Sequence, residues 1–185
     1  MTKQDAIYRT LRESANNKYL NGIQKFRDDT GLTHHLLSNG AICIDSMDPL
    51  VKDIPESLKH VYRAESRKNL ESMTRLVAQI ANKASDSLFL PPAKWFEQAC
   101  IAAKREKNMM CAVKIDTRYY NCEYVARALR LCGSGACVVS SYHRPAIIVY
   151  SKDFSVTVAI MAINPAFVHG NYEIVQYEGK DVIIA

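Results

Sequence analysis

The sequence contains no apolar run long enough to span a membrane, and its first residues, MTKQDAIYRT, lack the apolar centre of a secretion signal. It also lacks a P-loop, a GxGxxG loop and the GxSxG motif of serine hydrolases. We therefore expect a cytoplasmic protein with no membrane partner. Because no catalytic motif is present, we expect a protein that is not an enzyme.

Paired metal-ligand motifs are also missing. The six cysteines form no CxxC pair and fall mostly at apolar helix or strand positions, which favours buried free thiols over disulfides or a metal site: Cys43, Cys100, Cys111, Cys122, Cys132 and Cys137. Adjacent His34 and His35 would point to different sides of a strand, which suits a metal poorly. We expect no metal and no cofactor. A nucleophilic pair such as Cys137 with His143 stays open as an alternative, because such pairs form in space.

The composition is that of an ordinary folded chain. At 185 residues, with 48% hydrophobic and 23% charged residues, it can form one domain, with or without a helical appendage. The net charge of +5 permits a polyanionic partner without requiring one. No internal repeat or low-complexity segment is visible.

The N-terminal segment, residues 1–65, is expected to combine helix and hairpin. Thr2 and Asp5 form a plausible cap for a first helix. Residues 19–26 could form another helical turn or two. Asn39-Gly40 lies between apolar runs, which is a strong hairpin signal.

A clamp-like domain is expected over residues 66–185, although one continuous domain is also compatible with the sequence. Its first helix should reach Lys83, starting near residue 55 or 66, and a second should start at Pro91-Pro92 and bury Trp95. Residues 172–184 resemble a terminal β-hairpin.

Residues 114–164 have the most regular pattern. Asn121 can cap a helix that ends at Gly133, and the apolar residues between them share one face. Three β-branched runs follow, at residues 136–142, 145–150 and 155–163. Their short connections favour antiparallel neighbours, so we predict an α+β fold with helices packed on an antiparallel sheet.

This segment resembles the C-terminal βαβββ unit of the bacterial DNA polymerase sliding clamp. The resemblance rests on the order of these matching residues: Tyr120-Asn121, Tyr124-Val125, Ala128-Leu129, Arg144-Pro145-Ala146-Ile147-Ile148 and Ala159-Ile160-Met161. The chain departs from the family after Met161, where it has Ala162 and Asn164 in place of the usual proline and basic residue. It is also shorter than a bacterial clamp subunit.

Basic residues are in excess between Lys94 and Arg130, with eight Lys or Arg against four Asp or Glu. If these residues share one face, they would form a binding surface for phosphates. If they are scattered, they would be ordinary solvent-exposed charges. Clamps hold duplex DNA loosely through basic side chains on helices. The resemblance therefore implies these DNA-binding candidates: Lys104, Arg105, Lys107, Arg127 and Arg130.

The closing strand of bacterial clamps helps to form an apolar pocket for peptides of polymerases and other replication factors. The resemblance thus implies that Pro145, Ala159 and Met161 bind a partner, although alternate positions of a closing strand face inward and Met161 could instead be core. We expect an oligomeric, clamp-like DNA replication or repair factor. The alternatives are an interaction or regulatory module that keeps the fold without encircling DNA, and an enzyme using an unseen Cys or His site.

Overall fold

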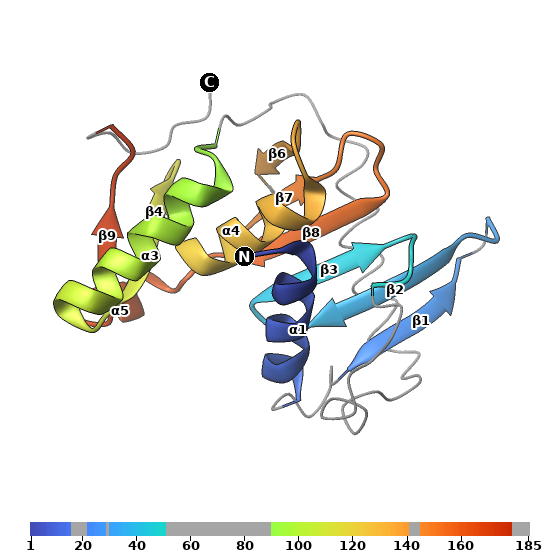
Figure 1. Ribbon diagram of the computed structural model, residues 1–185, viewed down its shortest axis with the longest axis horizontal. Helices are drawn as coiled ribbons and strands as arrows, with labels where there is room; N and C mark the ends of the chain where they lie inside the picture. Colours follow the sequence, from blue (N-terminus) through green and yellow to red (C-terminus); the bar gives the residue numbers. More distant parts are fainter. Residues whose placement is uncertain (16–21, 29, 51–89, 141–144, 179–185) are drawn as a thin grey trace.

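A six-stranded antiparallel sheet dominates the computed structural model, which describes residues 1–15, 22–28, 30–50, 90–140 and 145–178 (Figure 1). Its strands follow the order β1-β2-β3-β8-β7-β6. The strands are β1 (Ile23–Arg27), β2 (Thr33–Ser38), β3 (Ile42–Ser46), β6 (Cys137–Ser140), β7 (Ala146–Tyr150) and β8 (Val156–Met161). β3 pairs with β8 in the middle, so both halves of the chain share one sheet.

The two halves of this sheet repeat one order of elements. Helix α1 (Lys3–Ser14) precedes β1-β2-β3, and helix α4 (Cys122–Cys132) precedes β6-β7-β8. Both helices pack on the same face, where Leu11 and Val125 share one apolar core with Ile44 and Val158. The chain therefore contains two helix–strand–strand–strand units that meet along β3 and β8.

Local hydrogen bonds explain where both helices begin. The Thr2 hydroxyl accepts from the backbone amide of Asp5 at 3.1 Å, and the Asp5 carboxylate accepts from the amide of Thr2 at 2.8 Å. The Asn121 side chain accepts from the amide of Glu123 at 2.9 Å. α4 ends at Gly133, whose φ of 80° favours glycine. These start and stop signals were predicted from the sequence and are confirmed.

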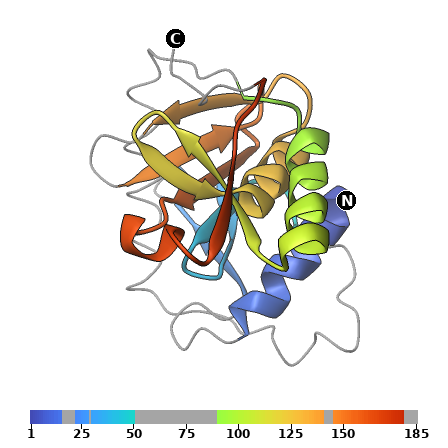
Figure 2. The same ribbon diagram turned by 90° about the vertical axis from the view of Figure 1, so that its left-hand side faces the viewer.

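A third helix and a smaller sheet cover the outer side of α4. Helix α3 (Ala93–Lys107) packs along α4 and against β4, on the same side of the molecule as α1 (Figure 2). The smaller sheet has the order β5-β4-β9, and its strands are β4 (Met110–Ile115), β5 (Arg118–Asn121) and β9 (Tyr172–Val175). The short helix α5 (Pro165–Val168) precedes β9 in the chain. β9 runs parallel to β4. α4 is thus enclosed between the large sheet and α3.

The large sheet buries side chains on both faces. The face opposite the helices carries a second apolar cluster: Leu36, Cys43, Val139, Ile148, Tyr150 and Ala159. Strand residues alternate between this cluster and the main core, as the period of two requires.

The α+β class and the antiparallel sheet are confirmed, whereas a helical N-terminal half is not. The described residues before position 51 form one helix and three strands. A helical turn was expected over residues 19–26, but residues 23–26 lie in β1 and pair with β2 instead, because sheet pairing buries Ile23. The helix expected to end at Lys83 lies outside the described residues. In the C-terminal segment β9 pairs with β4, and the second half of the expected hairpin lies outside the described residues.

No helix among the described residues could cross a membrane.

Candidate functional site

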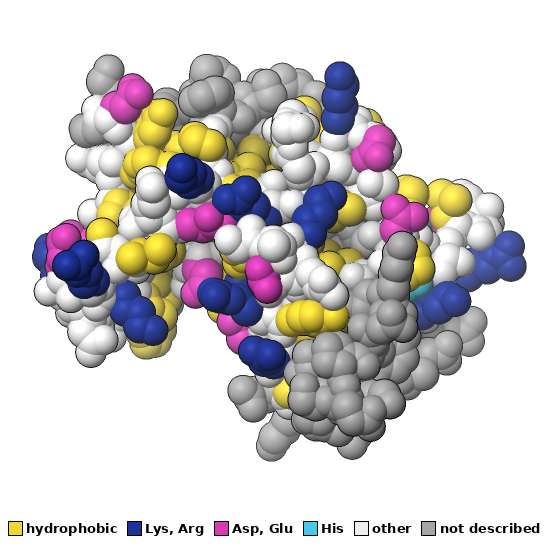
Figure 3. All heavy atoms as spheres, viewed as in Figure 1, with side chains coloured by type: hydrophobic (Ala, Val, Ile, Leu, Met, Phe, Trp, Pro, Cys, Tyr) yellow, Lys and Arg dark blue, Asp and Glu magenta, His cyan; other side chains and the backbone are white. Residues whose placement is uncertain are grey.

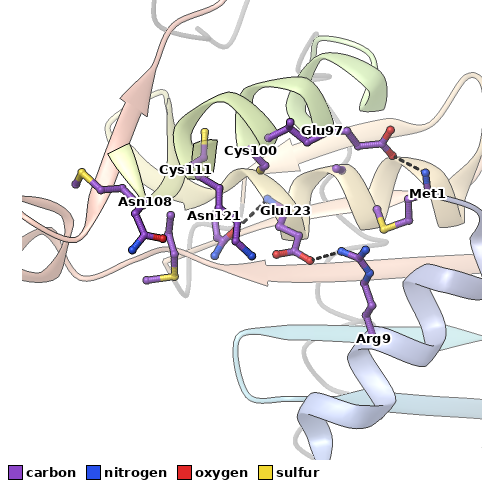
Figure 4. Close-up of a pocket in the computed structure, with 13 residues that line it drawn as sticks. Met1, Arg9, Glu97, Cys100, Asn108, Cys111, Asn121 and Glu123 are labelled. Carbon is purple, nitrogen blue, oxygen red and sulfur yellow. Dashed lines mark hydrogen bonds and ion pairs between the residues drawn. The ribbon is translucent and has the colours of Figure 1, made fainter. Parts of the chain in front are cut away.

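A cavity of about 560 Å³ lies where α1, α3, α4 and β4 meet (Figure 4). Its rim is charged. Arg9 of α1 binds Glu123 of α4 at 3.0 Å, and the N-terminal amine lies 3.7 Å from Glu97 of α3. Lys104 also lines the cavity. The rim therefore offers carboxylates and cations at the same opening.

The wall of the cavity includes exposed apolar side chains. Met1, Ile101, Met109 and Met110 line it, and Ile101 and Met110 are 66% and 52% exposed. Methionine is flexible and polarizable, so such a wall can adapt to different apolar groups. The site can accept an apolar side chain of a partner between charged residues.

Two thiols line the same cavity. Cys100 comes from α3 and Cys111 from β4, and the thiols of both interact with Cys122, the first residue of α4. All six cysteines of the chain are free, and Cys43, Cys111, Cys122 and Cys132 are buried. The sequence suggested free thiols, but no spacing rule pointed to a cluster.

Arg127 lies in the core rather than on a DNA-facing surface. Its side chain is 1% exposed. Its guanidinium donates to both carboxylate oxygens of Glu13 at 2.6 and 2.7 Å and to Glu123 at 2.7 Å. Burial opposes its charge, but these hydrogen bonds outweigh burial and raise the pKa of Arg127. A guanidinium held in this way links α1 to α4 and cannot reach a phosphate.

Arg130 is also engaged within the protein. Its Nε and one terminal nitrogen donate to the two carboxylate oxygens of Glu97 at 2.9 and 3.0 Å. The pair fastens α4 to α3, and the hydrogen bond raises the pKa of Arg130. The two α4 cations expected to bind DNA therefore serve helix packing first.

The three cations predicted on the preceding helix are exposed in its last turn. Lys107 forms an ion pair with Glu173 of β9 at 2.9 Å, so this carboxylate would compete with a DNA phosphate for the lysine. Lys104 and Arg105 form no ion pair with any other residue that the structure describes. Helix α1 adds exposed Lys3, Arg9 and Arg12 on the same side of the molecule, a group that the sequence analysis missed. The amphipathic pattern of the first helix was the signal that could have indicated them.

The residues predicted to bind a partner come from neighbouring strands. β7 pairs with β8 so that Ala146 faces Met161, which places Pro145 beside that end of β8. Pro145 is exposed, Met161 is partly exposed, and Ala159 is buried. Ala159 and Met161 lie on the face opposite the helices. The structure brings Pro145 and Met161 together, with Ala159 inside the fold.

A charged cluster links β2 and β3 on that same face. Nδ1 of His34 lies 3.0 Å from both oxygens of Asp45, and Nε2 lies 3.2 Å from Asp28. Burial raises the pKa of Asp45, and hydrogen bonds, that from Thr30 foremost, lower the pKa of Asp28 to about 2. Each ring nitrogen of His34 thus contacts a carboxylate, and these contacts hold β2 and β3 together.

Neither a metal site nor a Cys–His pair emerges from the described part of the chain. No group of three potential ligands is gathered there in a metal-binding arrangement. Cys137 is half-buried in edge strand β6, and its suggested partner His143 lies outside the described residues.

The chain has no match among protein-family models, curated proteins or solved structures.

Proposed function

We propose that the chain is a clamp-like accessory protein of DNA replication or repair that binds duplex DNA without sequence preference. The repeated helix–strand–strand–strand unit carries the proposal. The second unit bears the sequence resemblance to the sliding clamp, and the first unit repeats its order of elements. Both helices lie on one face of the shared sheet. A helix-covered face is the surface through which clamps hold DNA.

The exposed cations on this side support the proposal. Lys3, Arg9 and Arg12 of α1 and Lys104 and Arg105 of α3 reach solvent there. Figure 3 shows Lys and Arg side chains dispersed over this face among Asp and Glu side chains. A mixed surface of this kind favours weak, salt-sensitive contact with phosphates rather than recognition of bases. In this proposal the α1 and α3 cations replace Arg127 and Arg130.

The sheet edges support assembly into an oligomer. Among the described strands, β1 and β6 end the large sheet, and the strand order makes them run in opposite directions. Pairing β1 of one copy with β6 of the next would therefore be antiparallel and would continue the sheet. Such a head-to-tail contact either closes into a ring or continues as a filament. We propose the closed form, around a duplex.

We propose that a polymerase-type partner binds the face of the large sheet opposite the helices. Pro145 and Met161 are accessible where β7 and β8 pair at their ends, whereas Ala159 is buried beneath that surface. The alternative, an interaction module that does not encircle DNA, is favoured by the cavity wall of Ile101, Met109 and Met110. Both functions need an apolar segment from a partner, and only the first needs DNA.

Charge reversal on α3 tests the DNA contact. We expect Lys104→Glu and Arg105→Glu each to weaken binding to a fluorescent duplex about three- to tenfold at low salt, because each removes roughly one phosphate contact. The salt dependence, log K against log[salt], should become shallower by about one. Titrations followed by fluorescence anisotropy measure both quantities.

Lys152→Glu is the matched control. Lys152 is an exposed cation in the turn between β7 and β8, outside α1 and α3, and its reversal changes the net charge by the same amount. It should leave the affinity and the salt slope nearly unchanged. Equal losses in all three variants would contradict a DNA contact on the helix face and leave only a net-charge effect.

A further inference from the structure

Three thiols from three different elements converge beside the cavity. Cys100 lies on α3, Cys111 on β4 and Cys122 at the start of α4. β4 and β5 pair as far as Ala112 and Asn121, and Cys111 and Cys122 are the next residues beyond that pair. α3 packs over both and brings Cys100 to them.

The three thiols differ in access to solvent. Cys111 is 3% exposed and Cys122 is fully buried, whereas Cys100 is half-buried. Cys100 and Cys111 line the cavity and Cys122 does not. A small molecule entering the cavity therefore meets Cys100 first, with Cys111 next to it.

The neighbouring thiols favour a thiolate at Cys100. The proximity of Cys111 and Cys122 lowers the pKa of Cys100, while burial and the charges of Glu123 and Glu97 oppose this. The neighbouring Cys100 raises the pKa of Cys111, with further contributions from burial and Glu173, so Cys111 keeps its proton.

The remaining cysteines lack this environment. Burial raises the pKa of Cys43 and of Cys132 to about 12, which makes both poor nucleophiles. Cys137 is half-buried like Cys100 but lies on edge strand β6, outside the cluster. Cys137 is therefore a matched reference for Cys100.

We propose that Cys100 is a peroxide-reactive nucleophile, that small hydroperoxides are its substrate class, and that Cys111 is its resolving thiol. The Cys100 sulfur attacks a peroxide oxygen and the O–O bond breaks, which leaves a sulfenic acid and an alkoxide or hydroxide that takes a proton from solvent. The Cys111 sulfur then attacks the sulfenic sulfur, forms a disulfide and releases water. In total two thiols lose two protons and two electrons, and the hydroperoxide takes them up to become an alcohol, or water, plus water.

Alkylation with iodoacetamide, read by peptide mass spectrometry, tests the nucleophile without any oxidant. The rate at a thiol of ordinary pKa, such as free cysteine, rises about tenfold per pH unit below that pKa. We expect the rate at Cys100 to rise less steeply between pH 5.5 and 7.5 than the rate at free cysteine, which gains about a hundredfold. Cys137→Ser should leave this profile unchanged. A rate at Cys100 that climbs in parallel with free cysteine would overturn the proposal.

Treatment of the full chain with hydrogen peroxide tests the second step. Peptide mapping of the wild type should find a disulfide between Cys100 and Cys111. In Cys111→Ala the sulfenic acid at Cys100 should accumulate and be trapped by dimedone, with folding checked by circular dichroism. Oxidation only at Cys137, or a disulfide between Cys100 and Cys122, would overturn the assignment even if the variant did not fold, because the wild-type map decides it. DNA binding is measured separately, so its failure leaves this result readable.

Discussion

Replacing Glu13 with alanine is expected to lower the free energy of unfolding by about 2 to 3 kcal/mol. Glu13 accepts two short hydrogen bonds from Arg127, whose side chain is 1% exposed. Removing one partner of a buried ion pair leaves the other charge buried and usually costs roughly 3 to 5 kcal/mol. We expect a smaller loss here because Glu13 is partly exposed and Glu123 still accepts from Arg127. Urea unfolding followed by circular dichroism measures it.

Arg9→Ala is the control for this prediction. It removes a pair with Glu123 in which the side chains are 56% and 41% exposed, so water can replace the lost contact. Exposed pairs contribute up to about 1 kcal/mol, and we expect a loss of about 0.5 kcal/mol or less. Equal losses for Glu13→Ala and Arg9→Ala would contradict the role of Arg127 as the buried link between α1 and α4.

Truncating Ile160 to alanine is expected to destabilise the protein by about 3 kcal/mol. Ile160 is fully buried in β8 between Ile42 of β3 and Ile147 of β7. The truncation removes apolar contacts and opens a cavity where the two units join, and the surrounding sheet can close over it only in part. The same urea titration gives the value.

The neighbouring residue provides the comparison. Met161 points to the opposite face and is partly exposed, so Met161→Ala should cost about 1 kcal/mol or less. A loss at Met161 as large as that at Ile160 would mark Met161 as core and remove it from a partner-binding surface. A loss below about 1 kcal/mol at Ile160 would show that the junction of the units is poorly packed.

Much of the fold could be predicted from local sequence. The caps at Thr2 and Asn121, the stop at Gly133 and the hairpin at Asn39-Gly40 are short-range signals, and the described structure contains all of them. The antiparallel order of the last three large-sheet strands followed from their short connections. These features depend on residues within a few positions of one another, which is why one sequence was enough.

The internal repeat could not be seen because it survives only as an order of elements. The first helix is capped by Thr2 and the second by Asn121, and the buried residues of the two helices differ in type, with Thr10 and Ser14 in the first and Arg127 in the second. The pairing of β3 with β8 joins residues more than a hundred positions apart, so no local sequence pattern predicts it. The strand at residues 23–27 was missed for a different reason, because its pairing with the adjacent strand β2 determines its conformation.

The candidate site was the least predictable part. Arg127 looked like a surface cation because arginine is mostly exposed, and its burial depends on Glu13 of the distant helix α1 as well as on Glu123. The two cysteines that line the cavity, and Cys122 beside them, come from three elements whose contacts are tertiary. By contrast, exposure of Lys104, Arg105 and Lys107 could be expected from their place in the last turn of α3.

The clamp-like function is tested most directly by comparing retention on circular and linear duplex DNA. The protein is loaded on a nicked circular duplex at low salt, and its mass is followed by light scattering before and after the circle is cut. The proposal predicts an oligomer that stays on the circle at moderate salt and leaves when the DNA is linearised. A monomer that binds neither circular nor linear DNA, or that remains bound to both equally, would contradict encirclement and favour an interaction module.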